Sequence, residues 1–159
     1  MSRSAFYTVF PDKTALPLRL TEDFQSQSAK LVAAWQSDDV AGLAALVSLY
    51  EQLLALFRQH VVVWAALRGV AAYDPAVRQS RAARVERLAA GARVRLLCDQ
   101  QAGLAPASMD ADAAITMVVW GGSEAMSRHL DTHDASRDAV FAGELACIVW
   151  YGAFRRPAE

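Results

Sequence analysis

Apolar residues along this chain recur every three or four positions, which is the spacing of an amphipathic helix. The clearest example lies between positions 40 and 61, where two apolar stripes run side by side. The first stripe consists of Val40, Leu43, Val47, Tyr50, Leu54, Phe57 and Val61, and the second of Leu46, Leu49, Leu53 and Leu56. Two adjacent stripes give a helix a broad apolar face and predict that it lies in the core. No segment shows convincing strand alternation or an Asn-Gly or Asp-Gly hairpin signal, so the pattern predicts an all-α fold.

Capping and helix-breaking residues divide this pattern into successive helices. Asp74 followed by Pro75 is a strong start signal, because aspartate caps a helix well and proline suits the first helical position. Gly103 and Pro106 end the same helix, and Asp134 is expected to cap the last one. We expect helices over about 12–35, 40–60, 64–72, 75–101, 113–126 and 134–154.

The last two of these helices are apolar on nearly every side. Between Asp138 and Arg155 the only charged residue is Glu144. The whole chain of 159 residues, long enough for one domain, is 54% hydrophobic and only 21% charged. Two such helices cannot both be surface helices of a monomer, so we expect them to pair across a two-fold axis as a four-helix dimer interface.

Charge and cysteine content exclude several classes of protein. A net charge of −1 gives no overall basic footprint for nucleic acid, so DNA binding would need a local surface. Cys98 and Cys147 show no paired spacing and are predicted to be buried core thiols. The chain carries no signal-peptide pattern and no apolar run long enough for a membrane helix, and it reads as cytoplasmic.

Candidate chemistry is sparse. No serine–histidine–aspartate, cysteine–histidine, paired-carboxylate or phosphate-loop pattern occurs in a plausible context, so we expect neither an enzyme nor a cofactor. His129 and His133 invite a metal interpretation, but they straddle a predicted gap between helices and are expected to form a polar surface turn. Glu124 and Arg128 have the spacing of a salt bridge along one helix.

The N-terminal segment carries a family resemblance. Phe6, Tyr7, Phe10, Asp12, Lys13 and Leu16 follow a pattern of aromatic helix, Pro-Asp-Lys turn and leucine-rich helix. This pattern resembles the TetR/AcrR family of transcriptional regulators, at the junction of the DNA-recognition helix and the ligand-binding body. The resemblance implies that residues 1–11 are a remnant of a helix-turn-helix domain and that residues 12–159 are a ligand-binding and dimerisation domain. The two preceding helices are missing, so we expect the chain as given to be unable to bind DNA. One hypothesis is that the true start codon lies upstream of Met1, and the alternative is a protein that is truncated at this point.

The resemblance also implies partners and sites. A homodimer through the last two helices would bind a double-stranded DNA operator, usually as a repressor, and a small, largely apolar effector would control that binding. The implied DNA contacts are Arg3, Ser4, Tyr7, Thr8 and Lys13, whose side chains suit base edges and phosphates. The predicted effector contacts are Tyr50, Phe57, Trp64, Thr116, Met117, Trp120 and Ser123.

Alternatives stay open for these residues and for the function. Aromatic and methionine stripes at helical spacing also suit a plain core, and the Gly121-Gly122 pair suits either a cavity or a close helix crossing. Gln52 and His60 are further polar candidates for the effector site. The alternative function is a stand-alone helical dimer that binds a small molecule or a protein without touching DNA.

Overall fold

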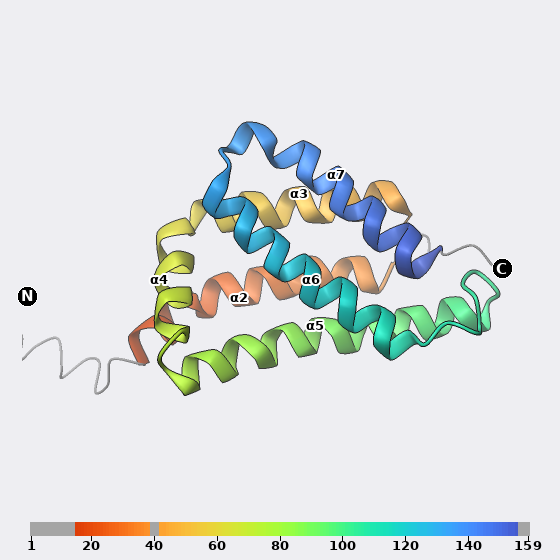
Figure 1. The fold of residues 1–159 in the computed structure, drawn as a ribbon, viewed down its shortest axis with the longest axis horizontal. Coiled ribbons are helices and arrows are strands. Elements are labelled where there is room, and N and C mark those ends of the chain that lie inside the picture. The colour runs from red at the N-terminus through yellow and green to blue at the C-terminus, as the bar shows by residue number, and fades with distance from the viewer. Residues whose placement is uncertain (1–14, 39–41, 156–159) are drawn as a thin grey trace, which may run out of the picture.

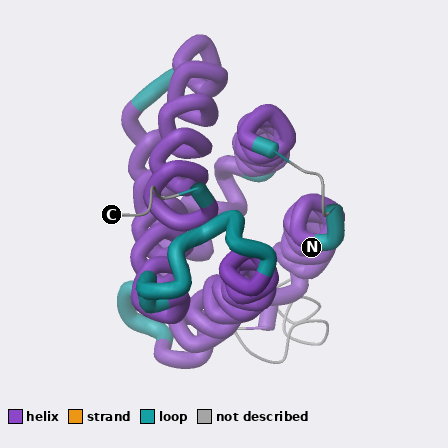
Figure 2. The backbone as a smooth tube through the Cα atoms, turned by 90° about the vertical axis from the view of Figure 1, so that its right-hand side faces the viewer, coloured by secondary structure: helices purple, strands orange, loops and turns teal. Residues whose placement is uncertain are grey.

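The computed structural model describes residues 15–38 and 42–155 (Figure 1). Within these ranges the chain forms helices and loops and no strand, which confirms the predicted all-α fold (Figure 2). The helices are α2 (Ala15–Gln36), α3 (Leu43–Gln59), α4 (Val61–Ala71), α5 (Pro75–Gln101), α6 (Ala111–Thr132) and α7 (Asp138–Val149). A short 3-10 helix (Ala135–Arg137) precedes α7, and a π-helical turn (Trp150–Phe154) extends it.

The boundaries of α5 are those predicted from its capping residues. One carboxylate oxygen of Asp74 accepts hydrogen bonds from the backbone N–H groups of Ala76, at 2.8 Å, and Val77, at 3.2 Å. Pro75 occupies the first helical position, where the helix has no use for a backbone donor. Gly103 follows the end of the helix with a φ of 71°, a conformation that glycine adopts without strain. Asp134 likewise caps the turn before α7, as expected.

The junction between α3 and α4 differs from the prediction. The helix α4 starts at Val61 instead of Trp64, and the chain turns through 84° between the two helices. His60 ends α3 and begins α4, so a single non-helical residue makes the corner. The apolar run after His60 contains no capping residue that marks where the new helix begins, and its three valines are weak helix formers. The bend sends α4 across one end of the bundle (Figure 1).

The helices pack in two groups around a shared core. Helix α3 lies against α2 and α7, while α5 lies against α6 and α4, and the view along the bundle shows all of them around one centre (Figure 2). The largest fully buried side chains include Phe24, Leu54, Leu96, Ile115 and Phe154. These five come from α2, α3, α5, α6 and the π-helical turn, so the core draws on elements along the whole described chain.

A partly buried polar cluster joins α3, α6 and α7. His129 is only 5% exposed and its Nε2 lies 2.8 Å from Oδ1 of Asp138. Arg58 donates to both carboxylate oxygens of Asp138, at 3.0 and 2.7 Å, and this pairing with Arg58, helped by His129, holds the pKa of Asp138 below its usual range. The expectation that His129 and His133 form a polar surface turn is therefore wrong for His129. It stacks on Phe141 at a centroid distance of 4.1 Å, because α7 folds back over the end of α6.

Other polar side chains also differ from their predicted surroundings. Glu124 pairs with Arg81 of α5 at 2.9 Å instead of with Arg128, because α5 lies directly alongside α6. Cys98 is exposed and Cys147 is half-buried, so the prediction of two buried thiols is wrong. Within the described ranges no group of three His, Cys, Asp or Glu side chains could hold a metal ion.

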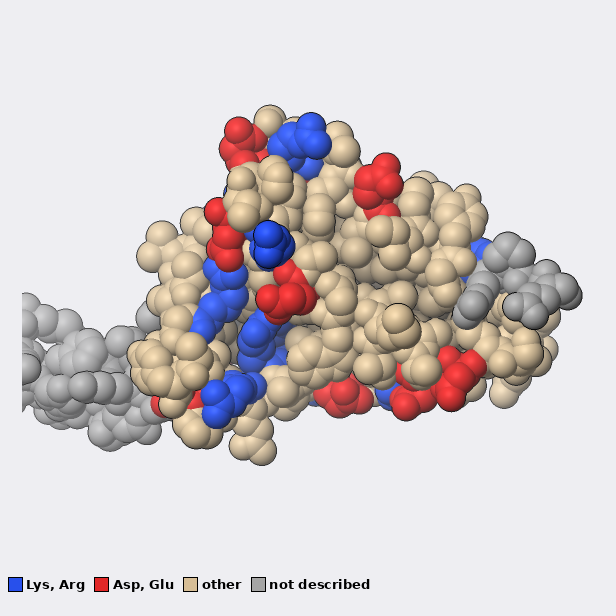
Figure 3. Space-filling view, in the orientation of Figure 1, with Lys and Arg blue, Asp and Glu red and all other residues tan. Residues whose placement is uncertain are grey.

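The outer sides of α6 and α7 carry exposed apolar residues. The largest are Met117, Trp120, Val140, Ile148 and Tyr151, which are between 39% and 75% exposed. On the face shown in Figure 3, charged residues gather near α4, at the corner between α6 and α7 and along the α5 edge, and an acidic patch lies over α7. Uncharged surface separates these groups on the rest of this face. We call Met117, Trp120, Val140, Ile148 and Tyr151 the outer apolar face. In the described part of the chain, no single helix is long and apolar enough to cross a membrane.

Candidate functional site

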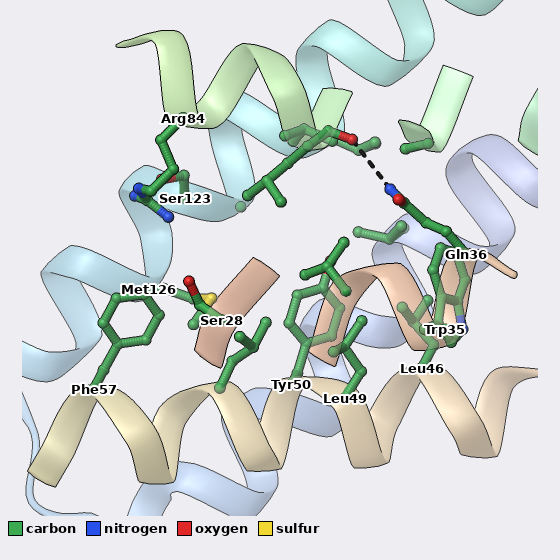
Figure 4. Close-up of a pocket in the computed structure, with 18 of the residues that line it drawn as sticks. Ser28, Trp35, Gln36, Leu46, Leu49, Tyr50, Phe57, Arg84, Ser123 and Met126 are labelled. Carbon is green, nitrogen blue, oxygen red and sulfur yellow. Dashed lines mark hydrogen bonds between the residues drawn. The ribbon is translucent and has the colours of Figure 1, made fainter. Parts of the chain in front are cut away.

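A cavity of about 100 Å³ lies at the centre of the bundle (Figure 4). Its lining comes from α2, α3, α4, α5, α6, α7 and the π-helical turn. A site that draws on every helix forms only when the whole domain is folded. Ligand pockets in helical proteins commonly lie between helices in this way.

Most of the cavity wall is apolar. Leu49 and Leu53 of α3 form one side, and Val118 and Val119 of α6 contribute to the wall from another element. Phe57 and Trp64 add aromatic surface, with ring centroids 4.9 Å apart. Phe24 packs against both rings from α2, at 4.8 and 5.7 Å, and fixes their positions from behind. These walls suit a hydrocarbon or aromatic ligand.

Four of the seven predicted effector contacts line this cavity. Tyr50 and Phe57 rise into it from α3, and Ser123 reaches it from α6, as Figure 4 shows. Trp64 of α4 is the fourth. Burial raises the pKa of the Tyr50 hydroxyl, which keeps this group neutral and available as a donor at physiological pH.

The other three predicted contacts lie outside the cavity. Thr116 is exposed, Met117 is 75% exposed and Trp120 is 39% exposed, all on the side of α6 that faces away from the core. The inward side of α6 is centred on the buried residues Ile115, Gly122 and Met126, and Val119 and Ser123 lie at its border. Thr116 and Trp120 fall just beyond that border, and Met117 lies on the opposite side of the helix. The sequence pattern could not distinguish the two sides, since both are apolar.

The further candidates from the sequence, two glycines and two polar residues, also differ in whether they line the cavity. Gly122 lines the cavity, and a side chain there would meet a methyl group of Leu145 at 3.5 Å, whereas Gly121 lies on the exposed side. Gln52 points away from the cavity and donates to the hydroxyl of Ser48 at 3.1 Å. His60 packs on Phe24 at the α3–α4 corner, with ring centroids 5.7 Å apart.

Sequence reasoning missed the most polar residue of the cavity, Arg84. Its guanidinium carbon lies 5.3 Å from the ring centroid of Trp64, and the residue is only 8% exposed. Burial, together with the neighbouring charges of Arg81 and Arg87, lowers the pKa of Arg84 to about 10, so it stays protonated at neutral pH. The signal for Arg84 was present, because it stands four residues before Leu88 and eight before Ala92 on the inward stripe of α5.

Further polar groups complete the lining. Ser28 donates to the carbonyl of Gln25 at 3.0 Å, and Gln36 donates to the carbonyl of Leu88 at 3.2 Å. Figure 4 shows the second bond as a dashed line that links α2 and α5 at one end of the cavity. Both side chains are therefore held in position by the protein itself.

Several other polar atoms of the lining are buried and unpaired. They are Nη2 of Arg84, the hydroxyl oxygen of Ser127 and the indole nitrogens of Trp35 and Trp64, none of which has a hydrogen-bond partner among the described residues. All four groups can donate a hydrogen bond, and three of them can only donate. The cavity therefore suits a ligand that brings hydrogen-bond acceptors.

The predicted DNA contacts Arg3, Ser4, Tyr7, Thr8 and Lys13 lie outside the described residues. Comparison of the chain with protein-family models, with curated proteins and with solved structures finds no match in any of the three. The geometry of the cavity and of the outer apolar face is thus the ground for a functional proposal.

Proposed function

We propose that this chain is the effector-binding and dimerisation body of a TetR-like transcriptional regulator, usually a repressor. In this proposal a small molecule occupies the central cavity, and a helix-turn-helix domain that ends within residues 1–11 binds operator DNA. The observation that carries the proposal is the cavity itself. An apolar chamber lined by every described helix, with a few polar groups, is the expected form of a small-molecule site.

The outer apolar face supports the dimeric part of the proposal. The outer apolar face spans α6, α7 and the π-helical turn that extends α7. An exposed apolar surface of this kind is unfavourable in water and suits a partner with the same surface. A two-fold pairing would place the same face of each chain against the other, as symmetric dimers require. Such a pairing joins two α6 and two α7 helices as a four-helix interface.

The link from cavity to DNA would run through α2. This helix contributes Ser28, Val32, Trp35 and Gln36 to the cavity, and it directly follows the segment proposed to bind DNA. An effector that fits one orientation of α2 better than another would shift the population towards that orientation. Two recognition helices must lie about one turn of DNA apart, so a small change in α2 would lower operator affinity.

The test uses the chain together with any residues that are encoded in frame upstream of Met1. Binding to DNA from the flanking region is measured by fluorescence anisotropy, with and without small molecules recovered from the purified dimer. We expect a dimer that binds DNA tightly and releases it when the cavity is filled. No DNA binding by the extended dimer would overturn the proposal.

A matched pair of variants connects the DNA response to the cavity. Ser123→Trp places a large side chain in the cavity, whereas Thr116→Trp places the same side chain on the exposed side of the same helix. We expect Ser123→Trp to abolish the response to the effector and Thr116→Trp to leave effector binding intact. An unchanged response in Ser123→Trp would show that the effector acts elsewhere.

The second candidate function is a stand-alone helical dimer that binds a small molecule or a protein without DNA. The cavity and the outer apolar face would serve that function equally well. The two functions differ in whether the dimer carries a DNA-binding domain. A dimer that binds the same small molecules but shows no preference for any flanking DNA would favour this alternative.

A further inference from the structure

We infer that the ligand of the central cavity is an anion, namely a monocarboxylate with a short hydrocarbon or aryl body, and that its carboxylate pairs with Arg84. This inference rests on the proposed function, because it names the chemical class of the effector. It differs from the apolar effector that the sequence predicts by adding one negative charge at a defined end of the cavity.

The first argument is the state of Arg84 in the empty cavity. The arginine is 8% exposed, and its Nη2 atom is buried without a hydrogen-bond partner. The salt bridges of α5 join Arg81 to Glu124, Arg93 to Asp112 and Glu86, and Asp99 to Arg155. In the described part of the chain no salt bridge includes Arg84. A buried charge without a partner is strongly unfavourable, so such an arginine indicates a counter-ion that arrives from outside.

The position of the guanidinium rules out an ordinary surface arginine. A snorkelling arginine buries its methylene groups and keeps its charge in water. Arg84 instead lies with its charge over the ring of Trp64, beside Ser123 at one end of the cavity (Figure 4). The contact with Trp64 offsets part of the desolvation but leaves the N–H donors free for a ligand.

The second argument is the hydrogen-bonding character of the lining. The unpaired groups of Arg84, Ser127, Trp35 and Trp64 all offer donors, as described above. A carboxylate consists only of acceptors and can take two parallel bonds from one guanidinium. A neutral amide of the same shape would bring donors of its own to a site that already has an excess of them.

The third argument is electrostatic. The charged groups that influence Arg84 most are Arg81 and Arg87, both of which are positive. The carboxylate of Glu124 faces Arg81, and its side chain is 74% exposed. The local field at this end of the cavity is therefore positive and favours an anion.

The rest of the cavity sets the body of the ligand. A volume of about 100 Å³ is of the same order as the roughly 150 Å³ cavity that binds benzene in an engineered protein. The walls beyond Arg84 are Leu49, Leu53, Val118 and Val119, together with the rings of Phe57 and Trp64. A body of about six carbon atoms fills this space, so hexanoate and phenylacetate are suitable probes.

The experiment compares acids with their neutral amides on the purified 159-residue chain. Isothermal titration calorimetry measures the dissociation constants of phenylacetate and phenylacetamide, and of hexanoate and hexanamide, while acetate tests the need for a body. Hydrogen bonds to a charged group contribute about 1.5–3 kcal/mol, so we expect each acid to bind about tenfold to a hundredfold more tightly than its amide. We expect acetate to bind at least tenfold more weakly than phenylacetate.

Two arginine variants assign the preference to its residue. Arg84→Met removes the charge at similar length, and Arg87→Met makes the same change at an exposed position three residues further along the helix. We expect Arg84→Met to abolish the preference for the acid, and Arg87→Met to keep most of it. The comparison of acid and amide on the unchanged chain does not depend on either variant folding.

Three results would overturn the inference. The first is equal binding of acid and amide, the second is an acid preference that survives Arg84→Met, and the third is the absence of acid binding altogether. If the amides bind tightly and Ser123→Trp blocks this binding, the cavity binds neutral ligands. That result would overturn the inference of an anionic ligand and would remain compatible with the proposed function. By contrast, an extended dimer that does not bind DNA would overturn the proposed function while an acid preference at Arg84 still held.

Discussion

Replacing Arg84 with methionine should make the ligand-free chain more stable. Burial lowers the pKa of Arg84 from its ordinary value to about 10, with smaller contributions from Arg81 and Arg87. At about 1.4 kcal/mol per pKa unit this corresponds to roughly 3 kcal/mol against the protonated form in the folded state. Because folding lowers the pKa of this cation, the penalty is present in full below about pH 10 and shrinks only at higher pH.

The contact between Arg84 and Trp64 reduces the expected gain. A buried cation over an indole ring contributes about 1–2 kcal/mol, and methionine would lose that contribution while keeping most of the packing. The net stabilisation is therefore about 1–2 kcal/mol at pH 7, which corresponds to a rise in Tm of roughly 2–8 °C for a chain of this length. Most substitutions in a core destabilise, so a rise would be informative.

Chemical and thermal unfolding of three proteins tests this reasoning. The unchanged chain, Arg84→Met and Arg87→Met are unfolded at pH 7 with urea and with heat, and circular dichroism follows the helices. Arg87 is exposed, so its variant should stay within about 0.5 kcal/mol of the unchanged chain. Phenylacetate should then raise the Tm of the unchanged chain more than that of Arg84→Met. If Arg84→Met lowers the free energy of unfolding by more than about 1 kcal/mol, the reasoning that the unpaired charge of Arg84 destabilises the fold is refuted.

Three further predictions concern the fold and its surface. Asp138→Asn should destabilise the chain by about 2–3 kcal/mol at pH 7, because Arg58 loses its bidentate partner. Folding lowers the pKa of Asp138, so the difference in unfolding free energy between the unchanged chain and Asp138→Asn, measured in urea, should shrink as the pH falls below the ordinary pKa of aspartate. A difference that stays constant with pH would contradict the role of the pair of Arg58 and Asp138. Asp74→Ala should cost about 1 kcal/mol in the same assay by removing the cap of α5, and no change would mean that backbone or solvent groups replace it. Ile148→Asp should convert the proposed dimer to a monomer in light scattering, while Tyr73→Asp, an equally exposed change outside α6 and α7, should not.

The elements that the sequence predicted well are those with local chemical signals. The limits of α5 follow from Asp74 and Pro75 at one end and Gly103 at the other, each of which acts within a few residues of its own position. The start of α4 could not be predicted in this way, because the run after His60 is uniformly apolar and carries no capping residue. The bend of 84° there depends on how α4 packs at the end of the bundle, which is a property of the whole fold.

The candidate site shows a different limit. The α3 residues Tyr50 and Phe57 line the cavity because α3 has one broad apolar face that turns towards the core. Arg84 is not among the predicted contacts, because α5 carries more arginines than carboxylates and such a composition usually indicates a solvated helix surface. Arg84 stands four residues before Leu88, however, and this spacing places it on the inward side of the helix. The position along an apolar stripe is a better guide than the overall composition when one charged residue falls on that stripe.

Helix α6 explains why three predicted contacts were misplaced and what its composition means. Its inner side, with Val119, Ser123 and Met126, faces the cavity, and its outer side, with Met117 and Trp120, faces outwards. A helix that bordered only the cavity would carry polar residues on its outer side. Apolar residues on both sides indicate two apolar surroundings, of which the cavity is one and the proposed partner chain is the other. In that arrangement a ligand that moves α6 from inside would alter the contact between the two chains, so effector binding and dimer stability are expected to change together.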